Sequence, residues 1–244
     1  MIRAWNIATK PGAAGVAALL TASLMGCSSP EQATRSGSTT AVSSAGLASP
    51  AAAPLPSEAA SRSVQPRPFA KMSITIPSIG IRSVPVVPYV GQADDRPGTR
   101  IQNRGVAASP RGRRGGAGPG QIGNLIITAH RTSAGGPFRR LPSLRNGEHI
   151  LITSDGMIYD YVVTDTMTIS FRSARDIARQ SAPVPGQLGR PAEQPMITLS
   201  TCATPEDHAR RNFWKDKFGN PEHRINKIGV LVTTRAARSA ELPL

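Results

Sequence analysis

Short runs of apolar residues, divided by glycine, proline, asparagine and aspartate, follow one another from residue 72 onward. Most runs are rich in β-branched residues, and several alternate apolar with polar positions, which is typical of half-buried strands. The pattern predicts strands at residues 72–81 (interrupted at Pro77), 83–88, 124–129, 148–153, 157–163, 165–171, 196–201 and 225–233. Many short strands separated by turn signals predict an all-β domain, either a barrel or a sandwich.

Three segments between the strands have other patterns. Residues 172–180 fit a helical turn over one end of the sheet. Residues 204–218 fit a helix, because Thr204 can cap it, a proline and two acids follow, and a glycine comes after its end. Residues 91–123 are rich in glycine, arginine and aspartate and lack a phosphate-binding loop motif, so they are expected to form a mobile surface loop.

The N-terminal residues predict an export signal and a tether. Residues 1–26 combine a basic start with an apolar run at 12–24, which is typical of export signals. The ending Leu24-Met-Gly-Cys27 resembles a lipobox, in which Cys27 is diacylated, and an uncleaved signal anchor is the alternative. Residues 27–66 are rich in serine, alanine and proline, which predicts a disordered tether. Residues 67–244, with a core at about 71–235, are then the folded domain, outside the cytoplasmic membrane.

The folded domain is strongly basic. The chain has a net charge of +14; Arg3 and Lys10 supply two charges and residues 27–66 none, so +12 lies on residues 67–244. Such a domain favours anionic surroundings. The export signal argues against nucleic acid and leaves lipid head groups or wall polymers, although a basic surface can also serve solubility alone.

Cys202 is the candidate nucleophile. The chain has two cysteines, and if Cys27 carries lipid, Cys202 is a lone free thiol in an exported domain. Alternation places it on the more polar face of its strand, opposite Ile197 and Leu199. The helix expected after it would favour a thiolate through its positive end. The alternative is a small buried apolar side chain, which is the commonest state of a free cysteine.

Thiol chemistry needs a base and a donor for the oxyanion. Of the four histidines, His130 ends an apolar strand in the same way that Cys202 ends its own. Arg224 opens the last predicted strand, and its start would lie beside Cys202 if the two strands pair in antiparallel fashion. Taken singly, each residue also fits a purely structural role. The other histidines are at positions 149, 208 and 223.

Five motifs, in order, resemble the sortase family. Thr128-Ala-His130, Leu199-Ser-Thr-Cys202 and the segment 224–231 are similar to its His, T-L-x-T-C and Arg motifs, and residues 74–81 and 136–150 also match. The resemblance covers about residues 71–235 and is strongest to the class E sortases of high-GC Gram-positive bacteria.

The resemblance implies an eight-stranded β-barrel and cysteine transpeptidation. Cys202 would attack the Thr–Gly bond of a Leu-x-x-Thr-Gly-type sorting signal on a secreted protein and form a thioacyl intermediate. His130 would protonate the leaving group, and Arg224 would hold the substrate carbonyl and the oxyanion. An amine on a peptidoglycan precursor or a pilin lysine would resolve the thioester, with no cofactor.

Several alternatives stay open at this point. The connection from Cys202 to Arg224 is long, so Arg210 and Arg211 are substitutes if the helix at 204–218 does not fold back. No spaced metal-ligand cluster is present, although Asp94 and Asp95 could form a weak Ca²⁺ site.

Other classes of protein fit the sequence less well. Papain-like peptidases place Cys before His, and L,D-transpeptidases use a Ser-His-Gly-Cys context that is missing here. The non-catalytic alternative is a surface lipoprotein that binds anionic wall polymers through its basic face.

Overall fold

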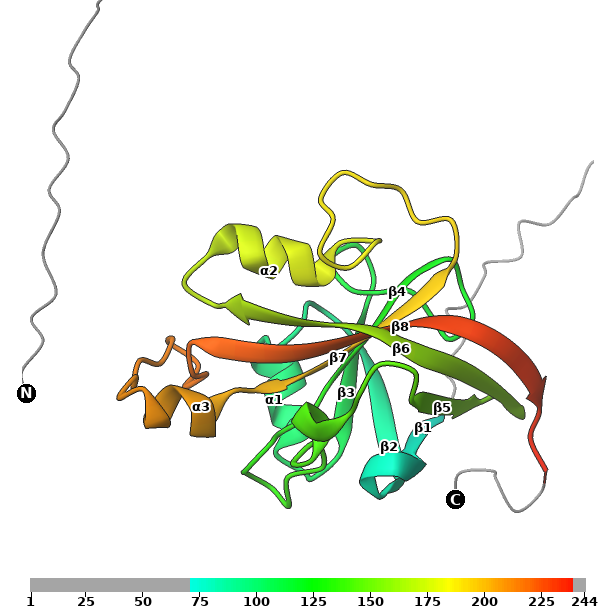
Figure 1. Cartoon of the computed structure of the whole chain (residues 1–244), viewed down its shortest axis with the longest axis horizontal. Coiled ribbons are helices and arrows are strands. Elements are labelled where there is room, and N and C mark those ends of the chain that lie inside the picture. Colours follow the sequence, from blue (N-terminus) through cyan, green and yellow to red (C-terminus); the bar gives the residue numbers. More distant parts are fainter. Residues whose placement is uncertain (1–70, 239–244) are drawn as a thin grey trace, which may run out of the picture. The chain divides into compact units, whose positions relative to one another are not determined.

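The computed structural model describes residues 71–238, in which eight strands form a closed barrel in the order β1-β2-β3-β4-β7-β8-β6-β5 (Figure 1). The strands are β1 Met72–Ile76, β2 Ile81–Val90, β3 Ala107–Arg111, β4 Gly123–Thr128, β5 His149–Ser154, β6 Met157–Ser170, β7 Pro195–Cys202 and β8 His223–Ala236. The helices are α1 Arg96–Gln102, α2 Ala174–Ser181 and α3 Thr204–Ala209, with 3₁₀ turns at η1 Pro77–Ile79 and η2 Leu141–Ser143. The predicted all-β barrel is confirmed.

The predicted export signal and tether, and Cys27, lie outside the described residues. Within residues 71–238, no helix is both long enough and apolar enough to span a bilayer.

Two apolar clusters hold the barrel together. The larger fills the interior and includes Ile197 and Leu199 of β7. The smaller lies on the outer side of β6, β7 and β8 and includes Met196. The predicted alternation along β7 is therefore confirmed, and both of its faces are buried. Burial of this kind excludes water and is the main stabilising contribution to such a fold.

A polar seam lies between α2 and the sheet. Gln180 of α2 is fully buried, and its Nε2 donates to Ser200 Oγ at 2.8 Å and to Asn226 Oδ1 at 3.1 Å. Asn124 Nδ2 donates to the main-chain oxygens of Gln180 and Ala182. These bonds link α2 to the face of β7 that also carries Cys202 and fix the position of the helix. Asn124 Oδ1, Gln180 Oε1 and Asn226 Nδ2 have no partner among the described residues.

The region expected to be a mobile loop is structured instead. Residues 91–123 contain α1 and β3. Asp95 caps α1 by accepting from Gly98 N at 2.9 Å, and a proline occupies the first turn. β3 is buried along its length and pairs with β2 in parallel, although it includes Pro110. Its glycine- and proline-rich surroundings hide this short strand in the sequence.

The helix predicted at residues 204–218 is wrong beyond Ala209. α3 stops there because Arg211 adopts a φ of 58°, and Asn212 N donates back to Asp207 O at 2.8 Å. The Asp207 carboxylate accepts from His223 N at 3.1 Å, which ties the short helix to the start of β8. The strands predicted at 157–163 and 165–171 form one strand, β6, with a register shift between Val163 and Asp165.

Candidate active site

The ends of β4 and β7 bring His130 and Cys202 to one edge of the barrel. The two strands are parallel, with Thr128 paired to Ser200. Beyond that pair, Ala129 N donates to Ser200 O at 3.2 Å, and Thr201 Oγ1 donates to Ala129 O at 2.8 Å. His130 and Cys202 therefore follow equivalent positions on strands that lie about 4.8 Å apart. The sequence prediction that these two strand ends meet agrees with this register.

Arg224 is the cross-strand partner of Cys202. β7 and β8 are antiparallel, and the register pairs the two residues directly, so their side chains project from the same face of the sheet. The Arg224 side chain is 1% exposed. Its Nη1 donates to Pro221 O at 3.3 Å, and its guanidinium lies 4.2 Å from the centre of the Phe171 ring. Among the groups in residues 71–238, its Nη2 has no hydrogen-bond partner.

Asp94 supplies the counter-charge for Arg224. Arg224 Nε donates to Asp94 Oδ2 at 3.2 Å, and Gln102 Nε2 donates to Asp94 Oδ1 at 3.1 Å and to Thr128 Oγ1 at 3.0 Å. Asn220 Nδ2 donates to the Asp94 main-chain oxygen at 3.4 Å. Since Asp94 is also buried, the pair is a desolvated ion pair whose partners depend on each other.

Burial favours the neutral forms of Cys202 and His130. It raises the pKa of the Cys202 thiol above its usual range; the Arg224 charge opposes that rise and the Asp94 charge adds to it. Burial also lowers the pKa of His130 below its usual value, with the Asp94 charge opposing and the Arg224 charge assisting. A protonated thiol and a neutral imidazole are therefore the main forms, and the thiolate is the minor, reactive one.

Asn103, which follows α1, orients the His130 ring. His130 Nε2 lies 2.7 Å from Asn103 Oδ1. An amide oxygen can only accept, so Nε2 carries the proton. In the neutral ring, Nδ1 is then the nitrogen that is free to take a proton.

Arg131 links the His130 loop to the residues after Cys202. Its guanidinium bonds both carboxylate oxygens of Glu206 in α3, one of them at 2.8 Å, and it donates to Cys202 O at 3.4 Å. The hydrogen bond from Arg131 lowers the pKa of Glu206. This bidentate contact closes the end of β4 onto the end of β7.

The other predicted candidates lie away from this cluster or serve local structure. His149 is exposed beside Asp160, His208 packs on Phe213, and His223 is bound by Asp207. Arg210 and Arg211, which were predicted as substitutes for Arg224, are exposed. Arg224 is the arginine paired with Cys202.

The possible calcium ligands are engaged by the protein itself. Asp94 faces Arg224, and Asp95 accepts from Gln92 N at 3.0 Å as well as capping α1. Residues 71–238 contain no group of three or more His, Cys, Asp or Glu side chains placed to bind a metal ion.

Sequence reasoning missed Asn103 and Arg131, and it considered Asp94 only as a calcium ligand and not as the partner of Arg224. Asp94 and Asn103 belong to residues 91–123, the segment that was expected to be a mobile loop. One signal could have located Asp94 and Asn103: Asp95-Arg-Pro97 has the form of a helix cap followed by proline in the first turn. It would have placed a short helix, with Asp94 before it and Asn103 after it.

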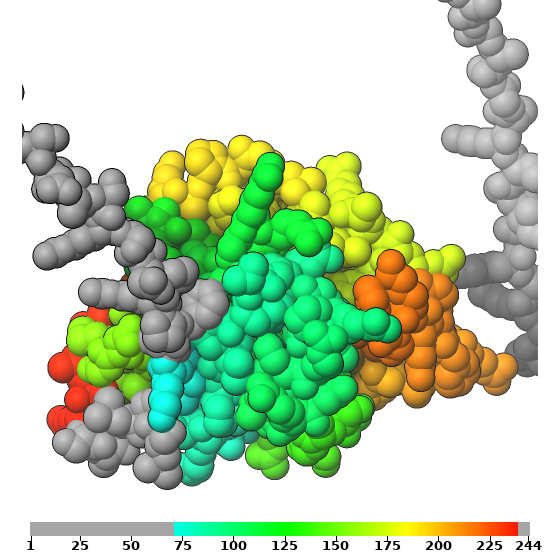
Figure 2. Space-filling model, turned by 180° about the vertical axis from the view of Figure 1, so that it is seen from behind, coloured from blue at the N-terminus to red at the C-terminus, as the bar shows by residue number. Residues whose placement is uncertain are grey.

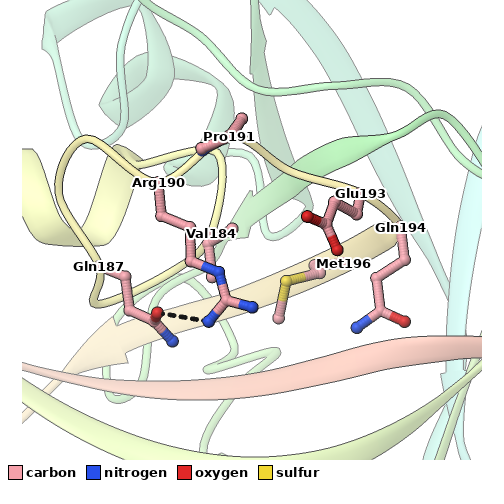
Figure 3. A pocket seen from close by; sticks show the side chains of 7 residues that line it. All are labelled: Val184, Gln187, Arg190, Pro191, Glu193, Gln194 and Met196. Carbon is pink, nitrogen blue, oxygen red and sulfur yellow. Dashed lines mark hydrogen bonds between the residues drawn. The ribbon is translucent and has the colours of Figure 1, made fainter.

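A hollow of about 410 Å³ lies elsewhere, between the segment 184–194 and the start of β7 (Figure 3). Polar side chains surround it, and Arg190 Nη1 donates to Gln187 Oε1 at 2.8 Å. Met196 lines it at one end of β7, whereas Cys202 ends the strand. Six residues of extended strand separate the two by about 20 Å, so the hollow is no part of the His130–Cys202–Arg224 cluster.

Comparison with known proteins places this arrangement in a family. The sortase domain model matches residues 74–214, which include His130 and Cys202 and stop before Arg224. The SrtA sortase from Actinomyces oris is 17% identical over 71% of this chain and 87% of its own, with a TM-score of 0.51. Sortase E1 from Streptomyces coelicolor, solved with a tripeptide in its active site, is 23% identical over 72% of this chain and 93% of its own, with a TM-score of 0.51. Curated proteins gave no match. The chain belongs to the sortase family of cysteine transpeptidases.

Proposed function

We propose that this protein cleaves a Leu-x-x-Thr-Gly-type sorting signal between Thr and Gly and transfers the secreted protein to an amine acceptor. The observation that carries the proposal is the strand register: β4, β7 and β8 bring His130, Cys202 and Arg224 to one edge of the barrel. The buried Arg224 Nη2, without a partner in the described residues, supports a role for Arg224 in binding substrate.

In the first half-reaction, the thiol proton of Cys202 passes to His130 and the sulfur attacks the Thr carbonyl carbon. The carbonyl oxygen becomes negatively charged in the tetrahedral intermediate. When the intermediate collapses, the C–N bond breaks, and His130 gives its proton to the departing Gly amine. A thioester on Cys202 then holds the secreted protein.

In the second half-reaction, the acceptor amine attacks the thioester carbonyl. Its excess proton passes to His130, and collapse breaks the C–S bond. The sulfur leaves as a thiolate that takes the proton back from His130. An amide forms and the enzyme returns to its starting state, so the cycle needs neither a cofactor nor an oxidant.

Arg224 is proposed to bind the oxyanion through Nη2. A charged donor in a water-poor site stabilises a developing negative charge more strongly than water does. The Asp94 carboxylate and the Phe171 ring hold the rest of the guanidinium. Asp94 is therefore a positioning residue, since it acts through Arg224.

Membership of the family supports a location at the cell surface and, in general terms, a sorting signal and an amine acceptor as partners. Sortases act at the cell surface on sorting signals and amine acceptors. We propose that residues 1–26 direct export, that lipid on Cys27 or a signal anchor tethers the chain outside the cytoplasmic membrane, and that residues 27–66 are the tether. The acceptor is proposed to be a peptidoglycan precursor or a pilin lysine.

Intact-mass spectrometry with a Leu-x-x-Thr-Gly peptide tests the chemistry. The wild-type protein should gain the mass of the acyl fragment at Cys202 and release a Gly-containing peptide. Cys202→Ala should lose both the adduct and transfer to an amine while it keeps its thermal unfolding midpoint. Transfer by Cys202→Ala at the wild-type rate would exclude this mechanism. A missing adduct together with binding to purified anionic wall polymer would favour the non-catalytic lipoprotein.

The anchor has its own test. A diacylglyceryl mass on an N-terminal Cys27 peptide from the producing cell supports the lipoprotein. An intact peptide that spans residues 1–40 supports the signal anchor.

A further inference from the structure

The segment between α3 and β8 exposes aromatic and cationic side chains together. Residues 210–218, here called the aromatic-cationic loop, contain Phe213 and Phe218, which are 65% and 40% exposed. With α3, the loop lies at the end of the barrel where β7 ends and β8 begins (Figure 1). In the space-filling view this orange segment stands out from the described surface (Figure 2). Large apolar side chains gathered on one projecting loop typically mark an interaction site.

The uncharged and acidic polar side chains of the loop bond to the protein itself. Asp216 Oδ1 accepts from Phe218 N at 2.8 Å and from Asn220 N at 2.9 Å. Asn212 Nδ2 donates to Glu222 Oε2 at 2.9 Å. Phe213 and Phe218 are exposed while these polar groups are already bonded, whereas Trp214 is half-buried. Exposed large apolar side chains are the informative exception on a protein surface.

The loop is held in this arrangement by its own backbone. Lys215 forms a β-bridge with Pro221, and Asp216 N donates to Asn220 O at 2.9 Å. Asn220, which is buried, also reaches the Asp94 main-chain oxygen beside Arg224. The exposed phenylalanines are therefore presented by a closed turn that is anchored at the edge of the site.

The outward-facing charge of the loop is positive. Arg210, Arg211, Lys215 and Lys217 are exposed, whereas the single acid of the loop, Asp216, is half-buried and occupied by backbone donors. Lys217 Nζ lies 5.1 Å from the centre of the Phe218 ring. Cations around exposed aromatic rings match an anionic bilayer surface, where rings enter the head-group region and cations meet lipid phosphates.

We propose that the aromatic-cationic loop docks on an anionic phospholipid membrane. Wall polymers would satisfy the cations, but they offer no apolar layer to Phe213 and Phe218, so the phenylalanines favour lipid. This inference goes beyond the proposed function and does not depend on chemistry at Cys202. Docking would hold the edge that carries Cys202 and Arg224 against the membrane surface.

The fluorescence of Trp214 in the full chain tests the proposal. The chain has two tryptophans, so Trp5→Phe leaves Trp214 as the only one. The protein is reconstituted in phosphatidylcholine vesicles with or without phosphatidylglycerol, and brominated lipid serves as the quencher. We expect quenching of Trp214 that rises with the phosphatidylglycerol fraction and falls in high salt. Quenching that is equal with and without phosphatidylglycerol would overturn the proposal.

Loop variants separate lipid docking from attraction to any polyanion. Phe213→Ser with Phe218→Ser should abolish the quenching, and Lys215→Gln with Lys217→Gln should weaken docking about fivefold for each cation lost. Arg113→Gln with Arg114→Gln, which removes two exposed arginines from another loop, should leave it unchanged.

Two results would contradict lipid docking. The first is quenching of Trp214 at the wild-type level in the variant with Phe213→Ser and Phe218→Ser. The second is a loss of quenching in the Arg113 and Arg114 control that equals the loss in the variant with Lys215→Gln and Lys217→Gln. Thermal unfolding midpoints equal to that of the wild type show that each variant is folded. The N-terminal segment is identical in all variants, so differences between them report on the loop.

Discussion

Asp94→Ala is expected to leave the Arg224 guanidinium buried without its carboxylate. Arg224 is 1% exposed and Asp94 is 7% exposed, so water reaches neither group easily. The substitution removes the 3.2 Å contact to Arg224 Nε and the 3.1 Å contact to Gln102 Nε2. Gln102 keeps its bond to Thr128, so the cost comes mainly from the uncompensated charge.

Removing one partner of a buried ion pair costs about 3–5 kcal/mol in the free energy of unfolding. A domain of this size has a total stability of about 5–15 kcal/mol, so the loss is a large fraction of it. At about 2–4 °C for each kcal/mol, the thermal midpoint should fall by roughly 10 °C. Asp94→Asn keeps an oxygen for Arg224 Nε and loses only the charge, so about 1.5–3 kcal/mol is expected.

Urea unfolding followed by circular dichroism and tryptophan fluorescence measures these costs. Asp160→Ala is the matched control, since it removes the half-buried partner of the exposed His149 and should cost less than about 1 kcal/mol. The same samples give kcat/KM for peptide transfer, which should fall in both Asp94 variants because the negative charge that positions Arg224 is lost, and fall further in Asp94→Ala because the hydrogen bond is lost too. If Asp94→Ala costs no more than Asp160→Ala, Asp94 does not hold Arg224 and the argument fails.

Three further predictions concern groups around the same edge. Because burial raises the pKa of Cys202, the folded protein holds the thiol proton more tightly than the unfolded chain, so the wild-type free energy of unfolding should fall as pH rises above about 8.5. Urea unfolding at pH 7 and 10 should show a smaller fall for Cys202→Ala than for the wild type, and an equal fall would contradict burial of the thiol. Asn103→Ala should lower kcat/KM about three- to tenfold through loss of the 2.7 Å contact to His130, without a lower thermal midpoint because Asn103 is exposed; recovery in Asn103→Asp is the check. Gln180→Ala should cost about 1–3 kcal/mol in urea unfolding by leaving Ser200 and its neighbours without partners, and a neutral result would argue against the polar seam.

Strand positions could be predicted because alternation and β-branching are local signals. The segment 196–201 has both, and β7 extends over it with the expected faces. The positions of His130, Cys202 and Arg224 at strand ends were visible in the same way. Whether His130, Cys202 and Arg224 lie close together depends on pairing between strands that are distant in sequence. The local pattern does not determine that pairing, and the family resemblance predicted it.

The rest of the site depends on contacts that no local pattern encodes. Asp94 matters because Arg224, far along the chain, needs a counter-charge. α3 ends at Ala209 although its sequence could continue: Arg211 adopts a left-handed φ, and the Asp207 carboxylate is held by His223 at the start of β8. In both cases a tertiary contact outweighs a propensity that is worth only tenths of a kcal/mol for each residue.

The direct pairing of Cys202 with Arg224 has a consequence for how this barrel tolerates change. Because the β7–β8 ladder sets the spacing of the two residues, the length of the chain between them does not. Residues 210–218 can then be lengthened, shortened or exchanged as a cassette, provided that Asn220 and the first residues of β8 stay in place. The proposed docking of the loop and the proposed transfer at Cys202 would then be open to separate alteration, in nature or by design.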